Sequence, residues 1–147
     1  MSPELEVFVE VQHFYGRQSL AIDRGEAADW AAMFTADGVF DSPTYPDPVV
    51  GTSALEEFAR TVHRGNPHLH HIVTNVALDD VTDDAVLVRA NLLIVATHDI
   101  TTGEARIERI TTITDRFRRL PELRLHHRLV VRDGQPDPLK KELPTHD

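Results

Sequence analysis

Four long stretches rich in β-branched and apolar residues fill the second half of this chain and constrain its fold more than any other feature. Three short turn-forming segments separate them: Asp79–Asp84, Asp99–Glu104 and Pro121–Glu122. Joins of this length connect antiparallel neighbours, so the pattern predicts a meandering antiparallel sheet. Each stretch is much longer than an average strand of about five or six residues, so the sheet must bend strongly. The four stretches are His68–Leu78, Ala85–His98, Ala105–Leu120 and Leu123–Arg132.

A long amphipathic helix is predicted at the start of the chain. Ser2 can cap it and Pro3 suits its first turn. Apolar residues then recur at three-, four- and seven-residue spacings, which carries the helix to about Asp23, and Gly25 ends it.

Two shorter helices and one short strand are predicted between this helix and the sheet. The second helix should run over Glu26–Thr35, followed by a turn into a strand at Val39–Asp41. The three prolines of Ser42–Gly51 favour a loop, which could form the rim or the lid of a site. The third helix should begin at Ser53, because Ser53 and Glu56 have the spacing of a capping box.

Helices followed by a bent antiparallel sheet predict an α+β fold. We expect a cone-shaped α+β barrel, in which three N-terminal helices pack on a strongly curved antiparallel sheet and enclose an apolar pocket. One domain should span residues 1–132, followed by a polar tail at 133–147. The predicted core around the pocket consists of Trp30, Phe34, Phe58, Val73, Leu93, Ile113 and Leu129.

Composition narrows the classes of partner. The net charge of −9 over 147 residues argues against nucleic acid, which requires a concentrated basic surface. No apolar run approaches the roughly 18 residues that cross a membrane, and the first residues lack the pattern of a signal peptide. The chain has no cysteine and no recognisable metal-binding pattern, so we expect a cytoplasmic protein without metal or other cofactor.

Two adjacent histidines open the first long strand, and a distant carboxylate is their candidate partner. Neighbouring side chains of a strand face opposite ways, so only one of His70 and His71 can point inward. Asp23 lies in the last turn of the first helix, where the helix dipole disfavours a carboxylate. The inward histidine is either a hydrogen-bonded core residue or a functional one, and Asp23 either bonds the turn that follows it or binds such a partner.

Further candidates for the site come from the aromatic residues and the last strand. Tyr15, Trp30 and Phe34 could form flat walls for a substrate, although aromatic residues at helical spacing also form ordinary cores. In the last strand, alternation places His127 inward and Arg128 outward.

Several of these segments also resemble one family. They are Tyr15–Asp23, Asp29–Phe34, Asp37–Phe40, Gly51, His71–Asn75 and Asp115–Phe117. Together they resemble the SnoaL-like family of the nuclear transport factor 2-like superfamily, over about residues 5 to 132, in the branch that includes scytalone dehydratase and hexachlorocyclohexane dehydrochlorinase. The resemblance implies the cone-shaped fold and a homodimer that packs the outer face of the sheet, which would give the many arginines of residues 106–132 a partner.

The resemblance also implies residue roles. His71 corresponds to a general base and Asp23 to the carboxylate that orients it and stabilises its protonated form. A further strand histidine of scytalone dehydratase would correspond, out of register, to His98. A tyrosine of the family is replaced by Ile113 here, which removes one possible acid and leaves the particular reaction open.

Three functions are compatible with these residues. The first is a cofactor-independent lyase, isomerase or cyclase acting on a hydrophobic, carbonyl-bearing small molecule such as a polyketide-type intermediate. The second is a non-catalytic ligand-binding protein, or an accessory subunit resembling the small subunit of ring-hydroxylating dioxygenases. The third is a hydrolase of the epoxide type, in which Asp23 and Asn91 would hold a water.

Overall fold

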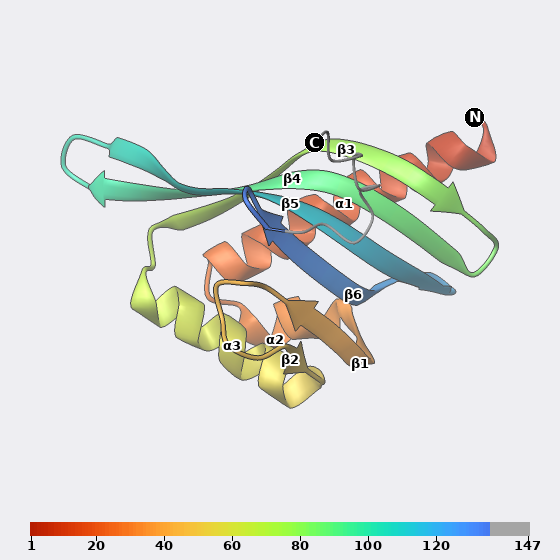
Figure 1. The fold of residues 1–147 in the computed structure, drawn as a ribbon, viewed down its shortest axis with the longest axis horizontal. Helices are drawn as coiled ribbons and strands as arrows, with labels where there is room; N and C mark the ends of the chain where they lie inside the picture. The colour runs from red at the N-terminus through yellow and green to blue at the C-terminus, as the bar shows by residue number, and fades with distance from the viewer. Residues whose placement is uncertain (136–147) are drawn as a thin grey trace, which may run out of the picture.

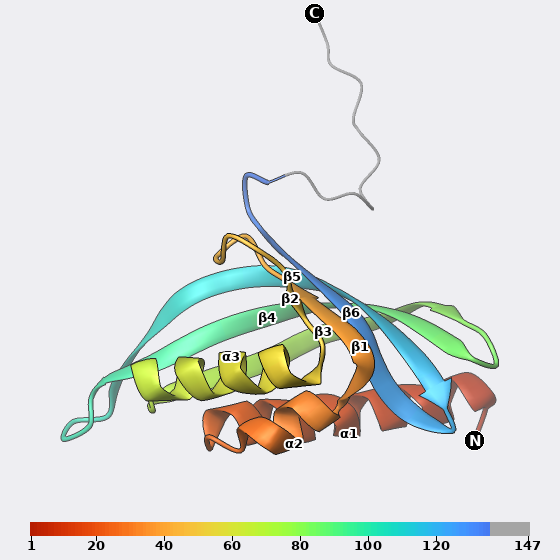
Figure 2. The same ribbon diagram turned by 90° about the horizontal axis from the view of Figure 1, so that it is seen from below.

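Three helices cover the concave side of one curved sheet in the computed structural model, which describes residues 1–135 (Figures 1 and 2). The α+β cone expected from the sequence is therefore confirmed. Most of the predicted tail, residues 136–147, lies outside the described part. The elements are α1 (Pro3–Asp23), α2 (Ala27–Ala32), β1 (Phe34–Asp41), β2 (Val49–Val50), α3 (Thr52–Gly65), β3 (Leu69–Val81), β4 (Ala85–Asp99), β5 (Glu104–Leu120) and β6 (Glu122–Arg132).

The sheet follows the order β2-β1-β6-β5-β4-β3. Strands β3 to β6 form the predicted antiparallel meander. The first strand, β1, lies parallel to β6, a pairing that was not predicted from the sequence. The short apolar pattern of β1 predicts a strand but carries no information about its direction, which is set by where the helices return the chain to the sheet.

The sheet curves over the helices (Figure 2), and its strand pairing is irregular at several places. In β3 the pairing with β4 shifts between Thr74 and Ala77, and Asn75 lies there at a φ of 54°. Asparagine tolerates this left-handed backbone better than most residues. Such bulges increase local twist and bend a strand, so they give the long strands the curvature of a cone.

A register shift in β6 overturns one sequence prediction. The pairing of β5 with β6 shifts between Arg116 and Phe117, opposite the two histidines of β6. The alternation of β6 therefore changes phase, so that Arg128 and Val130 are buried on the concave side and Leu129 is not. The predictions of an outward Arg128 and an inward His127 and Leu129 are wrong, because simple alternation holds only for a strand without a bulge.

Helix starts follow the predictions in part. Ser2 caps α1 by accepting a hydrogen bond from the Leu5 amide at 3.2 Å, with Pro3 in the first turn, as expected. The expected capping box of α3 is absent: α3 begins at Thr52 after Gly51, whose φ of 88° suits glycine. The second predicted helix ends early, because Phe34 already belongs to β1.

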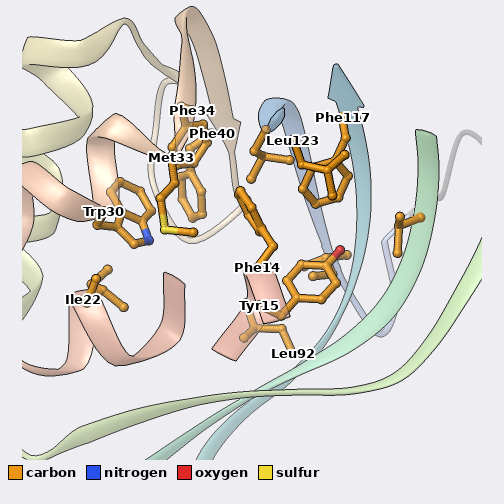
Figure 3. Packing of buried hydrophobic residues seen from close by; sticks show 14 of the residues in the cluster. Phe14, Tyr15, Ile22, Trp30, Met33, Phe34, Phe40, Leu92, Phe117 and Leu123 are labelled. Atoms are coloured by element: carbon orange, nitrogen blue, oxygen red, sulfur yellow. The ribbon is translucent and has the colours of Figure 1, made fainter. Parts of the chain in front are cut away.

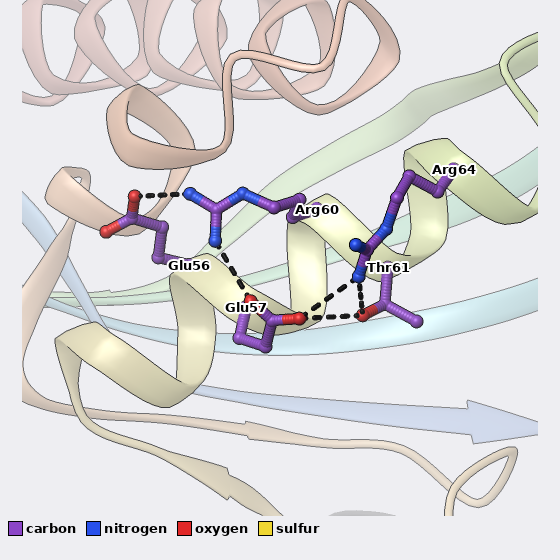
Figure 4. A network of polar contacts seen from close by, with 5 residues as sticks. All are labelled: Glu56, Glu57, Arg60, Thr61 and Arg64. Carbon is purple, nitrogen blue, oxygen red and sulfur yellow. Dashed lines mark hydrogen bonds and ion pairs between the residues drawn. The ribbon is translucent and has the colours of Figure 1, made fainter.

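The Glu56 carboxylate of the predicted capping box belongs instead to a surface network on α3 (Figure 4). Arg60 binds Glu56 at 2.8 Å and Glu57 at 2.9 Å, and Arg64 reaches Glu57 at 3.1 Å. These side chains are all substantially exposed, so each pair contributes little to stability.

The core lies between the helices and the concave face of the sheet, where aromatic rings from α1, α2, β1 and β5 meet (Figure 3). Of the predicted core residues, Trp30, Phe34 and Ile113 are buried, and Phe58 and Val73 pack against the core while partly exposed. The prediction fails for Leu93: its neighbours Leu92 and Ile94 are the buried ones in β4.

Candidate active site

A small cavity, with about 50 Å³ of space for water-sized molecules, lies between α1, α3, the concave face of the sheet and the loop after β1. Its apolar wall includes Ile22, Trp30, Phe40, Phe58, Leu92 and Ile94. Ser42, Thr44 and Tyr45 of the 42–48 loop also belong to the wall. The proline-rich segment therefore borders the cavity, as its sequence predicts. The wall holds two arginines, Arg109 and Arg128, and no acidic residue, although the chain as a whole is acidic.

Asp23 and His71 are in direct contact beside this cavity. The Nδ1 atom of His71 lies 2.6 Å from Oδ1 of Asp23. The backbone amide of His71 also donates to both carboxylate oxygens of Asp23, each at 3.1 Å. The two side chains are 15% and 11% exposed, so the pair is sheltered but reachable. Two separate attachments to one carboxylate fix the position of the imidazole ring.

The chain geometry explains this pairing. Asp23 is the last residue of α1, where unpaired carbonyls make the helix end negative. A carboxylate there needs donors from outside the helix, and β3 supplies them from His71. Alternation then leaves His70 exposed, so the prediction that only one of the two histidines points inward is confirmed.

The imidazole also faces the cavity. His71 contributes to the cavity wall, and its Nε2 atom makes no hydrogen bond with any residue of the described chain. His71 pairs across the sheet with Ile94 of β4, which pairs with Arg109 of β5. Cross-strand partners share a face, so these three side chains form one row on the concave side. A cation and an imidazole thus flank an apolar strip two strand spacings wide, about 10 Å.

A second, fully buried polar group lies deeper in the cone. Arg128 donates to Asp115 from Nε at 2.9 Å and from Nη2 at 2.8 Å, and the Tyr15 hydroxyl donates to the same carboxylate at 2.8 Å. Arg128 Nη2 also donates to Oε1 of Gln18 at 2.9 Å. Asp115 is entirely buried, and Gln18 and Arg128 form part of the cavity wall.

Burial and charge act together on this group. Burial raises the pKa of Tyr15 well above its ordinary value, and the neighbouring Asp115 charge raises it further. Burial, the largest single cause, lowers the pKa of Arg128, but the attraction and hydrogen bonds of Asp115 together with the contribution of Tyr15 outweigh it, and the net direction is upward. The hydroxyl therefore stays protonated and the guanidinium stays charged. The sequence held a signal for this group, because Ile113, Asp115 and Phe117 share one face of a strand and a charged residue among apolar ones requires a buried partner.

The structure brings together only some of the residues selected from the sequence. Asp23 and His71 are in contact and Trp30 lines the cavity, whereas Tyr15 and Phe34 are packed in the core outside its wall. Trp30 and Phe34 stack edge to face at 4.8 Å between centroids.

The three other selected residues lie away from the cavity. Asn91 lies between the inward residues Ala90 and Leu92 of β4, so its side chain is on the opposite, outer face of the sheet. There it pairs across the strands with Thr112. His98 lies at the far end of β4, where it is exposed and pairs with Glu108. His127 is half-buried, and burial lowers its pKa. Across residues 1–135 no cluster of three or more His, Cys, Asp or Glu side chains could hold a metal ion.

Comparison with known proteins identifies a family for nearly all of the described residues. The family model of the SnoaL-like domain matches residues 3–134. A structure from Catenulispora acidiphila in complex with S-DNPA is 28% identical, with a TM-score of 0.77, and the match covers 88% of this chain and 96% of that one. ActVI-ORFA from Streptomyces coelicolor is 24% identical, with a TM-score of 0.76 over 88% of this chain and 99% of that chain.

A third similar structure is described as a subunit of an enzyme complex. It is assigned as the beta subunit of an aromatic-ring-hydroxylating dioxygenase from Novosphingobium aromaticivorans, and it is 18% identical, with a TM-score of 0.72 over 92% of this chain and 94% of that chain. At this identity the likeness concerns the fold alone. No curated protein matches the chain. Among the described residues, no helix is long and apolar enough to cross a membrane.

Proposed function

Because this chain belongs to the SnoaL-like domain family, we propose that it is a cofactor-independent lyase, isomerase or cyclase that uses an Asp23–His71 general-base dyad. The substrate is a hydrophobic, carbonyl-bearing small molecule, such as a polyketide-type intermediate. One observation carries the proposal: His71 contacts Asp23 through Nδ1 at 2.6 Å and also forms part of the cavity wall.

The dyad supplies a base of suitable chemistry. Asp23 accepts the Nδ1 proton of His71, which leaves the lone pair on Nε2. Nε2 can then take a proton from a carbon next to a carbonyl, and the nearby carboxylate stabilises the imidazolium that forms. The same proton can return to another carbon in an isomerisation, or leave with a hydroxyl group as water in an elimination.

The cavity wall supports a flat, electron-rich ligand. Trp30, Phe40 and Phe58 provide aromatic surface, with Trp30 and Phe58 rings 5.7 Å apart between centroids. The wall contains cationic but no acidic side chains, which favours the negative charge that develops on a carbonyl oxygen when a neighbouring proton is removed. The similarity to the structure in complex with S-DNPA supports a small-molecule ligand.

The test is proton exchange from a model ketone. 2-Tetralone in D₂O, followed by NMR, reports removal of protons next to a carbonyl without requiring the native substrate. His71→Ala should abolish the protein-catalysed exchange, and Asp23→Asn should reduce it by about 100-fold or more, since positioned acid–base groups contribute about 10²–10⁴. Both variants should remain folded by circular dichroism. Full exchange by His71→Ala would end the proposal.

A homodimer through the outer face of the sheet belongs to the same proposal. Ile72, Leu93 and Ile110 form a cross-strand row on that face, and Ile72 and Ile110 are 44% and 58% exposed. Exposed apolar side chains in a row are typical of an interface. Sedimentation at micromolar concentration should give a dimer that Ile110→Asp dissociates, and a wild-type monomer would remove this part.

A non-catalytic role is the second candidate, as a ligand-binding protein or an accessory subunit. The same apolar row favours it, because a face that could pair with a second copy could also bind a catalytic partner. The fold-level likeness to a dioxygenase beta subunit is consistent with this candidate. Tight ligand binding without any His71-dependent proton exchange would favour it over the enzyme.

A further inference from the structure

Gln18, a residue of the cavity wall, holds a hydrogen-bond donor that is not used within the described chain. Its side chain is 2% exposed and belongs to the cavity wall. Within the described chain its Nε2 atom is buried and has no hydrogen-bond partner. A buried polar group without a partner costs free energy, so its presence in a cavity wall indicates a partner that arrives from outside the chain.

The orientation of the Gln18 amide is determined by its neighbour. Arg128 can only donate hydrogen bonds, so the amide atom that meets Arg128 Nη2 at 2.9 Å must be the oxygen. The amide nitrogen is therefore the free end, and it offers donors rather than an acceptor. Arg128 is itself held in place by two hydrogen bonds to Asp115, so this orientation is locked from behind.

The neighbouring cation also strengthens the donor. An amide whose oxygen accepts a hydrogen bond from a guanidinium is polarised, which makes its N–H groups better donors. Gln18 lies five residues before Asp23 on α1, about 7–8 Å along the helix axis. Gln18 and His71 line the same cavity, so one ligand in it can contact both residues.

We infer that Gln18 is a catalytic residue, whose Nε2 group donates a hydrogen bond to the substrate's carbonyl oxygen. Arg128 and Asp115 are its positioning residues. This inference rests on the proposed function. His71 Nε2 removes the proton from the carbon next to the carbonyl, and the electron pair of that C–H bond forms a C=C bond. The former C=O pair moves to the oxygen, where Gln18 stabilises the resulting enolate. Protonation of the enolate or loss of a β-hydroxyl group as water then completes the reaction.

The discriminating variant is Gln18→Glu. Glutamate keeps the length of the side chain and an oxygen for Arg128, but it replaces the free donor with a carboxylate oxygen. The matched control is Gln12→Glu, the same substitution at an exposed position of α1. Gln18→Met, which removes the donor without adding charge, gives the same comparison if the glutamate variant does not fold.

The experiment measures binding of enolate mimics rather than turnover, so it stands apart from the test of the dyad. The probes are 4-nitrophenol, 2-naphthol and 2-anthrol, whose oxyanions resemble an enolate and whose ionisation is visible in absorbance or fluorescence. The wild type should bind at least one of them and favour its ionised form. Gln18→Glu should weaken that binding by about 10- to 100-fold, the range of one hydrogen bond to a charged group.

The outcomes separate cleanly. Weakened binding and a lower ionised fraction of the bound probe in Gln18→Glu, with Gln12→Glu equal to the wild type, would support the inference. Wild-type behaviour of Gln18→Glu would overturn it, and so would failure of all three probes to bind the wild type. If the probes behave as expected but His71→Ala retains ketone exchange, Gln18 recognises a ligand oxygen while the proposed general base is wrong.

Discussion

Asp23–His71 and Asp115–Arg128 are both hydrogen-bonded pairs of a carboxylate and a basic side chain, but they lie in different environments. Asp23 and His71 meet at the edge of the cavity, and one imidazole nitrogen makes no hydrogen bond with the described chain. Asp115 and Arg128 meet in the interior, where Tyr15 and Gln18 complete the network. In the interior, Asp115 accepts hydrogen bonds from both Arg128 and Tyr15, which stabilises the fold. The role we propose for the sheltered Asp23–His71 pair is proton transfer through the imidazole nitrogen that Asp23 does not bind. The comparison predicts that variants of Asp115–Arg128 lose stability, whereas variants of Asp23–His71 lose proton exchange.

The largest effect on stability should follow from breaking the interior pair. Asp115→Ala leaves the Arg128 guanidinium buried without its counter-charge and the Tyr15 hydroxyl without its acceptor. Loss of one partner of a buried ion pair costs about 3–5 kcal/mol. Urea unfolding of Asp115→Ala against Asp23→Ala would measure the contrast, and equal losses in the two variants would contradict the distinction between the pairs.

Trp30→Ala tests the packing on which both pairs rely. Trp30 is 2% exposed and contacts Phe34, Phe40 and Phe58 through its ring. Removing a buried tryptophan side chain should lower the free energy of unfolding by about 3–5 kcal/mol. A Trp30→Ala protein that melts at the temperature of the parent would show that the ring is not part of the core.

Tyr15→Phe should have a smaller effect on the interior pair. The substitution removes the hydroxyl that donates to Asp115 at 2.8 Å but keeps the ring and both hydrogen bonds from Arg128. A hydrogen bond to a charged group contributes about 1.5–3 kcal/mol, and the expected loss lies in this range. Chemical denaturation measures it, and a neutral result would mean that Arg128 alone satisfies the carboxylate.

The contribution of His127 to the free energy of unfolding should depend on pH. Burial lowers the pKa of His127 in the folded chain, so the unfolded chain binds its proton first as the pH falls. Its contribution to stability is complete above the unfolded pKa of about 6.5 and is lost as the pH falls through the folded value. His127→Gln should therefore lose less stability than the wild type between about pH 7 and pH 5. Parallel curves for the two proteins over this range would contradict the assignment.

The smallest effect is expected for the surface network of α3. Glu57→Gln removes a charge that pairs with Arg60 and Arg64, but all three side chains are largely exposed. Exposed pairs contribute about 0–1 kcal/mol, so the melting temperature should barely change. A loss comparable with that of Tyr15→Phe would mean that the network supports the position of α3 over the cavity.

The fold could be predicted further than the site because it depends on patterns that repeat over many residues. The four long strands and α1 follow from apolar periodicity and turn residues, and their bounds agree closely with the structure. The parallel pairing of β1 with β6 and the bulge in β6 could not be predicted, because each depends on how distant segments meet. That bulge alone reversed the expected orientations of His127, Arg128 and Leu129.

The contact between Asp23 and His71 was predicted from an anomaly at each residue together with the family resemblance, which selected His71 rather than His70. Asp23 is an acid at the negative end of a helix, and His71 is an inward histidine in an apolar strand. Gln18 carried no such signal, because a polar residue in an amphipathic helix is ordinarily exposed. Its burial depends on Arg128, whose orientation depends on the bulge.

A double-mutant cycle on ketone exchange tests the proposed dyad most directly. The exchange rate of 2-tetralone in D₂O is measured for the wild type, His71→Ala, Asp23→Asn and the double variant. If Asp23 acts through His71, the double variant should exchange no more slowly than His71→Ala alone, because residues that act as a unit are not additive. Exchange that persists in His71→Ala, or losses that add in the double variant, would contradict the claim that these two residues form one general base.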